Sequence, residues 1–235
     1  MIDFDRYDVI SFDCYGTLID WERGIVSGLR PVLRNHGVEA TDEEILNLHA
    51  QIEHELQSGS TKGHYVKYRS VLEQEVREAG KRWGFEPEPF EVRSLADSLR
   101  RWRPFPDTVE ALEMLKERYK LAIISNVDDG LFALTACHLE VEFDWIVTAE
   151  QAGTYKPSTN NFEVAIERMG VERGRLVHAA ESLFHDVAPA GSLGISTVWV
   201  HRRAGKGGFG ATPPSDARPD LEVPDLKTLA SMACS

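Results

Sequence analysis

The sequence predicts an α/β protein, in which a parallel sheet carries helices on both faces and a helical segment is inserted near the start. Three observations support this fold class. Short apolar runs end in polar residues, helical patterns separate most of these runs, and residues 21–102 contain no strand pattern. The chain has 235 residues, of which 42% are hydrophobic and 27% charged, a composition typical of one or two globular domains.

The apolar runs are interpreted as buried strands because each is short and is followed by turn-forming or acidic residues. They span residues 7–13, 121–125, 143–148, 176–179 and 195–200.

Two helices are expected between these strands. The first begins at a capping-box pattern, Asp107 with Glu110, and its apolar side chains recur at helical spacing. The second is expected to be capped by Asn161, and Phe162 and Met169 belong to its apolar face. Strands that alternate with helices indicate a parallel sheet covered on both faces.

Residues 21–102 break this alternation. Thr41 with Glu44 forms a capping-box pattern ahead of an apolar stripe, and a second stripe begins near Tyr65. We expect an α/β core domain of residues 1–20 and 103–235, and a helical domain of residues 21–102. The Gly-, Pro- and Asp-rich residues 204–224 are expected to form a long surface loop.

Charge and composition exclude several partners. Lys and Arg number 26 against 38 Asp and Glu, a net charge of −12, which disfavours nucleic acid and anionic membranes. No apolar run is long enough to cross a bilayer, and the first residues show no secretory signal. Cys14, Cys137 and Cys234 are widely spaced, as in reduced cytoplasmic proteins. We therefore expect a cytoplasmic protein.

Polar residues follow four of the predicted strands. Asp13 ends the first, Ser125 the second, Lys156 follows the third, and Glu181 and Asp186 follow the fourth. The carboxyl ends of parallel strands meet at one edge of a sheet, where ligands bind. The sequence therefore predicts one pocket that contains several acids, a Lys and a hydroxyl.

The first of these segments carries the clearest motif. An apolar strand ends at Asp13, and Gly16 allows a sharp turn whose backbone N–H groups can hold an anion. A carboxylate in this position can act as a nucleophile. By itself, Asp13 is equally compatible with capping a turn or a helix.

The four segments together resemble the haloacid dehalogenase superfamily over nearly the whole chain. Its four motifs match residues 13–20, Ser125-Asn126, Lys156-Pro157 and residues 181–186, in that order. The resemblance implies a Rossmann-like parallel sheet, and it implies that the helical insertion is a mobile cap.

Tyr15 distinguishes between branches of this superfamily. Its phosphatases carry a second Asp at this position, which acts as the general acid for the leaving alcohol and helps to form a Mg²⁺ site. A phenol is a poorer proton donor at neutral pH, whereas halide leaves carbon without protonation. The motif at residues 13–18 resembles that of the type II (L-2-) haloacid dehalogenases, which need no metal.

This resemblance implies a catalytic role for four residues. Asp13 attacks C2 of a small 2-substituted carboxylic acid and forms an ester, which water then hydrolyses. Lys156 keeps Asp13 ionised and oriented, Thr17 braces it, and Asp186 positions or activates the water.

The resemblance also implies which residues bind substrate. Ser125 and Asn126 would hydrogen-bond the substrate carboxylate, together with backbone N–H groups near Tyr15 and Gly16. Glu181 belongs to the same set. A homodimer is expected, because dimers are common in the family.

Two departures from the family pattern leave alternatives open. Glu181 and Leu183 stand where the dehalogenases have a Ser and an Asn, and Glu181 with Asp186 partly resembles the Mg²⁺ site of the phosphatases. Although no cofactor is expected, a magnesium-dependent phosphatase therefore stays an alternative.

The second departure concerns the predicted cap. The Arg that receives halide in the dehalogenases has no evident counterpart, and the matching positions are His49 and Ala50. Several short segments also resemble the azetidine-2-carboxylate hydrolases, which open a strained ring at carbon. In such a reaction Glu181 or His185 could serve the leaving nitrogen.

Overall fold

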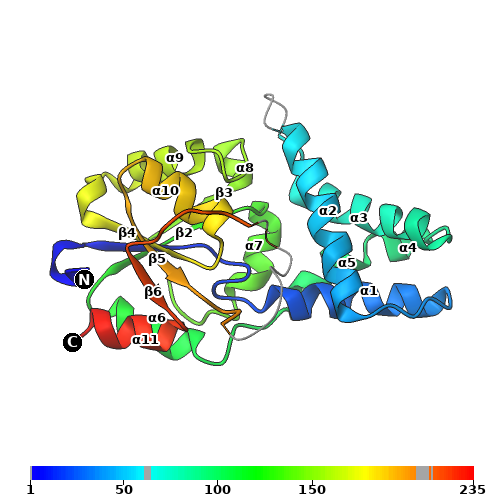
Figure 1. Ribbon diagram of the computed structural model, residues 1–235, viewed down its shortest axis with the longest axis horizontal. Coiled ribbons are helices and arrows are strands. Elements are labelled where there is room, and N and C mark those ends of the chain that lie inside the picture. The colour runs from blue at the N-terminus through cyan, green and yellow to red at the C-terminus, as the bar shows by residue number, and fades with distance from the viewer. Residues whose placement is uncertain (1, 61–64, 205–211, 213) are drawn as a thin grey trace.

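The computed structural model describes residues 2–60, 65–204, 212 and 214–235, and its centre is a six-stranded parallel sheet (Figure 1). The strand order is β3-β2-β1-β4-β5-β6, and every neighbouring pair is parallel. The strands are β1 (Val9–Phe12), β2 (Lys120–Ser125), β3 (Trp145–Thr148), β4 (Leu176–Ala180), β5 (Ser196–Val200) and β6 (Leu221–Val223). The predicted fold class is confirmed.

The central strands are apolar along their length because both faces of the sheet are covered. All four residues of β1 are buried, and Val9 lies opposite Lys120 of β2 and Leu176 of β4. Successive side chains alternate between two cores: Ile10 belongs to one cluster and Val9 to the other. This burial on both sides explains the continuous apolar runs in the sequence.

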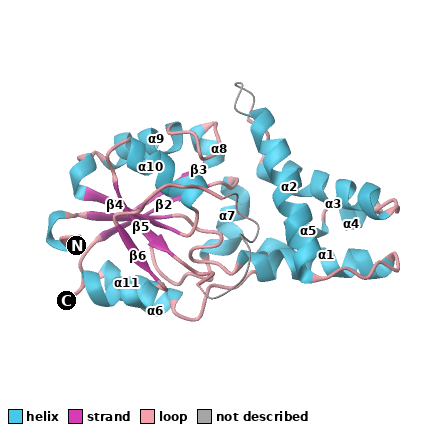
Figure 2. Cartoon of the chain, viewed as in Figure 1, coloured by secondary structure: helices cyan, strands magenta, loops and turns pink. Residues whose placement is uncertain are grey.

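Helices cover the two faces of the sheet, as Figures 1 and 2 show. One face carries α8 (Ala149–Ala152), α9 (Asn160–Met169) and α10 (Ala188–Ser192), and the other carries α6 (Thr108–Lys116) and α11 (Leu226–Ala233). The remaining elements here are η1 (Phe4–Arg6), α7 (Asp129–Ala136), η3 (Arg173–Arg175) and η4 (Leu183–Val187), the last a single π-helical turn.

In the described part of residues 21–101 every regular element is a helix, and this helical segment projects from the carboxyl ends of the strands (Figure 1). It contains α1 (Trp21–Asn35), α2 (Asp42–Ser60), α3 (Tyr68–Trp83), α4 (Pro89–Val92), α5 (Ser94–Ser98) and η2 (Leu99–Arg101). Gly24 lets α1 pack directly on the Trp102 ring, since a Cβ there would lie 2.4 Å from that ring. The close contact fixes the helical segment at its junction with the sheet.

The structure confirms one predicted helix start and corrects two others. The Thr41 hydroxyl accepts from Glu44 N, and the Glu44 carboxylate accepts from Thr41 N, which is a complete capping box at the start of α2. Asp107 forms no such cap, because its carboxylate pairs with Arg202. Asn161 is buried inside α9 and bonds Thr154. At Asp107 and Asn161 the side chain therefore binds a partner elsewhere in the fold instead of capping its own helix.

The expected surface loop of residues 204–224 is wrong for the last part of this range. Leu221–Val223 forms β6, which pairs with β5 through Trp199 opposite Glu222. A three-residue edge strand between Asp220 and Pro224 is too short to give a periodic signal. Residues 205–211 and 213 of this stretch lie outside the described residues.

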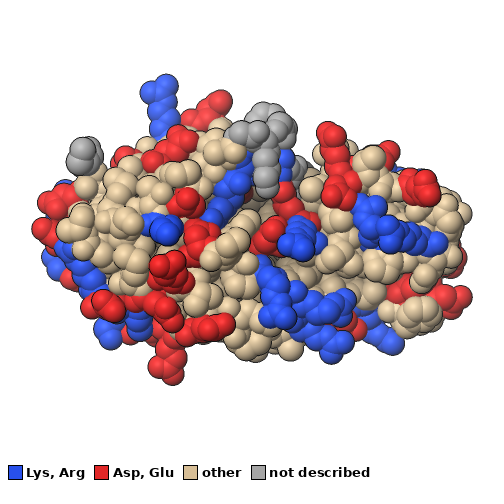
Figure 3. All heavy atoms as spheres, turned by 90° about the horizontal axis from the view of Figure 1, so that it is seen from below, with Lys and Arg blue, Asp and Glu red and all other residues tan. Residues whose placement is uncertain are grey.

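Acidic and basic side chains are interspersed over the face drawn in Figure 3. None of the helices in the described ranges is long and apolar enough to cross a membrane.

Candidate active site

The carboxyl ends of β1, β2 and β4 converge on a buried ammonium group. Lys156 Nζ donates to Asp13 Oδ1 at 2.9 Å, to Asp186 Oδ1 at 2.6 Å and to the Ile124 carbonyl at 2.8 Å. Lys156 and Asp186 are each 1% exposed. Three residues from separate segments, all predicted to share one pocket, are therefore in direct contact.

Thr17 holds the second oxygen of Asp13. Its hydroxyl donates to Asp13 Oδ2 at 2.9 Å and accepts from the Glu181 backbone N–H at 2.9 Å. The tight turn between β1 and α1 therefore connects Asp13 to the loop after β4. With Lys156 on one oxygen and Thr17 on the other, the carboxylate has a fixed orientation toward the cavity.

A buried polar chain that the sequence analysis missed extends behind Asp186. His178 Nε2 lies 3.0 Å from Asp186 Oδ1, and His178 Nδ1 lies 2.9 Å from Ser11 Oγ. Both new residues are inside central strands, where their polarity is hidden in apolar runs. The feature that could have revealed them in the sequence is a His and a Ser inside two apolar runs, which form the paired strands β4 and β1.

Burial and neighbouring charges set the protonation of the two acids in opposite directions. Burial raises the pKa of Asp13, and this outweighs the lowering effect of Lys156. Burial also disfavours the Asp186 anion, but Lys156 and His178 outweigh it and hold the pKa of Asp186 below its ordinary value. Burial lowers the pKa of Lys156, yet the two carboxylates raise it overall. The Lys is therefore charged, as its role requires.

Ser125 and Asn126 both line the cavity, but they differ in what they bind. Ser125 Oγ is buried and has no hydrogen-bond partner within the described chain. The Asn126 amide is occupied at both ends, because it donates to the Lys156 carbonyl at 3.0 Å and accepts from Lys156 N at 2.7 Å. Ser125 is thus open to a ligand, whereas the Asn126 side chain holds the Lys156 loop in place.

One of the backbone N–H groups expected near the substrate carboxylate, that of Gly16, is engaged within the turn. Gly16 N donates to the Ile19 carbonyl at 2.9 Å, so it is used within the turn. Gly16 has a φ of +94°, and a Cβ there would lie 2.8 Å from Trp21 Nε1, so the turn requires glycine. Tyr15 does line the cavity, and its hydroxyl lies 2.7 Å from Thr135 Oγ1.

The helical segment closes the other side of the cavity. Trp21 begins α1, Glu53 lies on α2 and Tyr68 begins α3, and all three line the same cavity as Asp13. The space open to the centres of water-sized spheres is about 40 Å³, so the cavity suits only a small ligand. Glu53 was missed in the sequence. Its spacing of four residues from His49, on the apolar face of α2, was the available signal.

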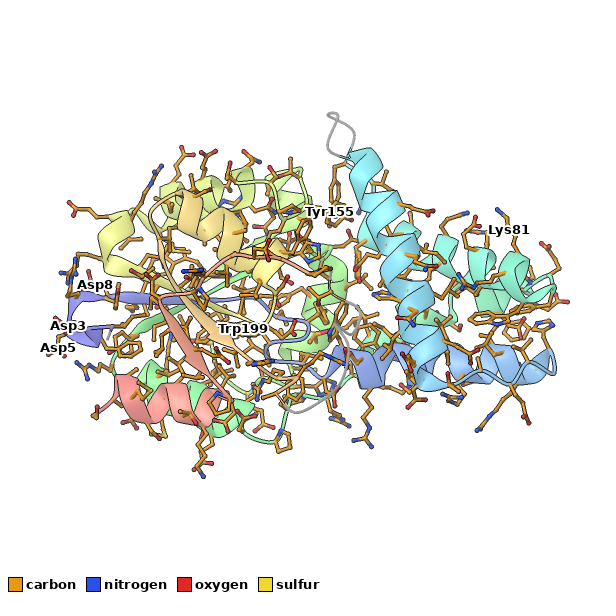
Figure 4. All side chains as sticks on the ribbon, viewed as in Figure 1. Asp3, Asp5, Asp8, Lys81, Tyr155 and Trp199 are labelled. Atoms are coloured by element: carbon orange, nitrogen blue, oxygen red, sulfur yellow. The ribbon has the colours of Figure 1, made fainter. Side chains whose placement is uncertain are left out.

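Asp128 connects the helical segment to the sheet region. Its carboxylate accepts from the Tyr65 hydroxyl and from the backbone N–H groups of Tyr68 and Arg69 at 2.7 and 2.8 Å. Figure 4 shows Tyr155 at the boundary between the two parts, and its hydroxyl donates to the Val66 carbonyl at 2.7 Å. The start of α3 is therefore held by the sheet region.

Glu181 lies on the cavity wall with its backbone carbonyl bonded by Trp199. Burial, with a contribution from Glu22, raises its pKa to about 7. His185 also lines the cavity, next to Ser182.

The residues present do not fit a divalent cation. Lys156 Nζ already binds Asp13 Oδ1 and Asp186 Oδ1, and Thr17 binds Asp13 Oδ2. Within the described ranges, no three His, Cys, Asp or Glu side chains are grouped as metal ligands.

Comparison with known proteins identifies the family. The model of the haloacid dehalogenase-like hydrolases matches residues 7–192. The chain belongs to this family. Among curated relatives of this hydrolase, a (S)-2-haloacid dehalogenase of Pseudomonas sp. (strain YL) is 25% identical over 95% of this chain and 93% of its own. A (S)-2-haloacid dehalogenase 4A of Burkholderia cepacia is 28% identical over 82% of each chain.

Solved structures confirm the fold of this haloacid dehalogenase-like hydrolase. The L-2-haloacid dehalogenase from Xanthobacter autotrophicus, with chloropropionic acid covalently bound, superposes with a TM-score of 0.81. It covers 96% of this chain and 98% of its own, at 22% identity.

Proposed function

We propose that this hydrolase acts at the carbon next to a carboxylate, on small 2-haloacids, through an ester formed on Asp13. The proposal rests above all on the fixing of both Asp13 oxygens, by Lys156 and Thr17, at a cavity where Tyr15 stands in place of a second acid. The curated relatives named (S)-2-haloacid dehalogenase support the same substrate class.

In the first step a carboxylate oxygen of Asp13 attacks C2 of the substrate. The new C–O bond forms as the carbon–halogen bond breaks, and the bonding electron pair leaves with the halide. The Lys156 ammonium keeps the Asp13 carboxylate ionised for attack. The unpartnered Ser125 hydroxyl is the group best placed to bind the substrate carboxylate.

In the second step water attacks the Asp13 carbonyl carbon and releases the 2-hydroxy acid. Asp186 lines the cavity and is held by Lys156 and His178, so it is the proposed residue that orients this water. The step regenerates the Asp13 carboxylate, and no part of the cycle uses a metal ion.

We infer that residues 21–102 act as a cap domain over a core of residues 1–20 and 103–235. Trp21, Glu53 and Tyr68 of the helical segment form one wall of the cavity, so closure there would exclude bulk water. The cytoplasmic location and the homodimer stay predictions. The free thiols of Cys14, Cys137 and Cys234 are consistent with the location.

A parallel assay tests this proposal. The enzyme is incubated with chloroacetate or L-2-chloropropionate, and separately with an aryl phosphate, each in EDTA or in Mg²⁺. We expect halide release in EDTA, abolished by Asp13→Asn. Phosphate release that requires Mg²⁺, without halide release, would overturn the proposal.

Ring opening of azetidine-2-carboxylate is a second candidate. The observation in its favour is the set of carboxyl groups on the cavity wall, Glu53 and Glu181 as well as Asp13 and Asp186, which suits a substrate that carries a basic nitrogen. Including azetidine-2-carboxylate as a third substrate in the assay distinguishes ring opening from halide release.

A further inference from the structure

The wall of the cavity that faces away from the sheet presents a carboxyl group. Glu53 lies on α2, is 7% exposed and lines the cavity. Its Oε1 accepts from the Tyr68 hydroxyl at 2.8 Å, while its Oε2 lies 3.6 Å from His49 Nε2, beyond hydrogen-bond distance. One oxygen of Glu53 is therefore fixed by Tyr68, and the other makes only the longer ion-pair contact with His49.

In-line displacement places the leaving group on the side of this carboxyl. Asp13 attacks from the end of β1, so the bond that breaks points away from the sheet region, toward the helical segment. Glu53 is on that side, and its charge interacts with that of Asp13 across the cavity. The group that leaves C2 therefore moves toward Glu53.

Among the lining residues that the structure describes, no Lys or Arg is left to receive a departing anion. Lys156 is the single Lys or Arg among the lining residues that the structure describes, and its ammonium is shared by Asp13 and Asp186. An ionised Glu53 would repel a leaving halide, whereas a protonated Glu53 would donate a hydrogen bond to it.

The groups around Glu53 raise its pKa overall. Burial raises the pKa of Glu53, Glu75 and Asp13 raise it further, and together they outweigh the lowering effects of His49 and of the Tyr68 hydroxyl. His49 is itself paired with Glu75 through a 2.8 Å contact at Nδ1.

We propose that Glu53 is a catalytic acid that donates its carboxyl proton to the group leaving C2, so that the site favours leaving groups that accept a proton. Fluoride is the halide that best fits this description. This inference rests on the proposed Asp13 ester chemistry. As the C–F bond breaks, its electron pair and the Glu53 proton together give HF. Hydrolysis of the ester releases one proton, which restores Glu53, so the cycle balances.

A leaving-group series tests the proposal. We measure kcat/KM for fluoroacetate, chloroacetate and bromoacetate with the wild type and Glu53→Gln, using Asp13→Asn as the blank for non-enzymatic halide release. Glu53→Gln is expected to slow fluoride release by about 100-fold and bromide release by about threefold or less, because bromide gains little from a proton. Glu55→Gln, an exposed position on the same helix, is the matched control and should change neither rate.

A second variant covers the case in which Glu53→Gln does not fold. Tyr68→Phe removes the hydrogen bond that lowers the pKa of Glu53, so the loss of fluoroacetate activity at high pH should move to higher pH. Equal slowing of all three halides, or a wild type that releases bromide but no fluoride, would overturn the role of Glu53. A wild type that releases no halide at all would instead overturn the proposed function.

Discussion

Lys156 is the residue on which the geometry of the site depends. Its ammonium satisfies one oxygen of Asp13, one of Asp186 and the Ile124 carbonyl, all within 2.9 Å. Two carboxylates this close to each other would otherwise share a proton, which would remove the nucleophile. The single positive charge therefore allows the proposed nucleophile and the proposed water-orienting acid to lie side by side.

Ser125→Ala separates binding from stability. Because Ser125 Oγ has no partner in the described chain, its loss breaks no internal hydrogen bond. A lost hydrogen bond to a charged substrate group is worth about 1.5–3 kcal/mol, so kcat/KM should fall by about 10- to 150-fold, mainly through KM. Steady-state kinetics on chloroacetate measure this, and thermal unfolding should stay unchanged. A lower melting temperature with unaltered KM would show that Ser125 is structural.

Residues at strand ends were predictable from sequence, and residues inside elements were not. Asp13, Lys156 and Asp186 follow strands, so the topology of a parallel sheet is enough to bring them together. His178 is within β4 and becomes visible only through its contacts with Asp186 and Ser11. Glu53 lines the cavity because of the way α2 packs on α1 and α3, and helical periodicity carries no information on that orientation.

At the scale of elements, the start of α3 depends on a residue from another part of the fold. The residue before α3, Lys67, provides no side-chain cap. Asp128, at the start of α7, accepts the first backbone N–H groups of α3 instead. The interaction that caps the start of α3 therefore also holds Tyr68, a wall residue of the cavity, next to the sheet region.

Asp128→Ala tests this coupling. The loss of a helix-capping carboxylate costs about 0.5–2 kcal/mol, and here the wall formed by Tyr68 should loosen as well. We expect a lower kcat/KM and faster hydrogen exchange at the amides of Tyr68 and Arg69. Glu113→Ala removes an exposed carboxylate from α6, away from α3, and serves as the control. If exchange accelerates equally in the central strands, the change is a global loss of stability instead.

Sequence pattern was least informative for short elements whose partners are distant. The edge strand β6 and the single turn η4 are each held by tertiary contacts: β6 pairs with β5, and η4 contacts β4 and β5. By contrast, the capping box at Thr41 and Glu44 is local, and the sequence predicted it correctly. Local signals were confirmed where no tertiary partner competed for the same side chain.

For the whole molecule, buried titratable groups confine maximal stability to mildly acidic pH. Burial lowers the pKa of His49, but the neighbouring carboxylates, Glu75 foremost, outweigh this effect and raise the pKa to about 9. The folded state therefore binds the His49 proton more tightly than the unfolded state does. The stabilisation that the His49 proton contributes is fully present below the ordinary His pKa, about pH 6.5. It is lost as the pH rises through the folded-state pKa, about 9. Burial raises the pKa of Glu181 to about 7, so the stability that its proton contributes is also lost as the pH rises.

At low pH the protein loses stability for the opposite reason, because a carboxyl group has a lowered pKa in the folded state. Burial disfavours the Asp144 anion, but Lys116 and Lys120 outweigh it and lower its pKa to about 2. Its contribution is present above pH of about 4 and is lost as the pH falls toward 2. Urea unfolding as a function of pH should show the largest free energy of unfolding between about pH 4 and 6.5. In His49→Gln the decline toward pH 9 should be shallower, and an unchanged slope would contradict this assignment.

The central claim is that Asp13 becomes covalently bonded to substrate carbon, and a single turnover in H₂¹⁸O tests it most directly. Excess enzyme is mixed with L-2-chloropropionate in labelled water, and both the product and the peptide that contains Asp13 are analysed by mass spectrometry. Hydrolysis of an Asp13 ester predicts ¹⁸O in the Asp13 carboxylate and unlabelled 2-hydroxypropionate. Label in the product hydroxyl with none on Asp13 would mean that water attacks the substrate directly, and would contradict the mechanism.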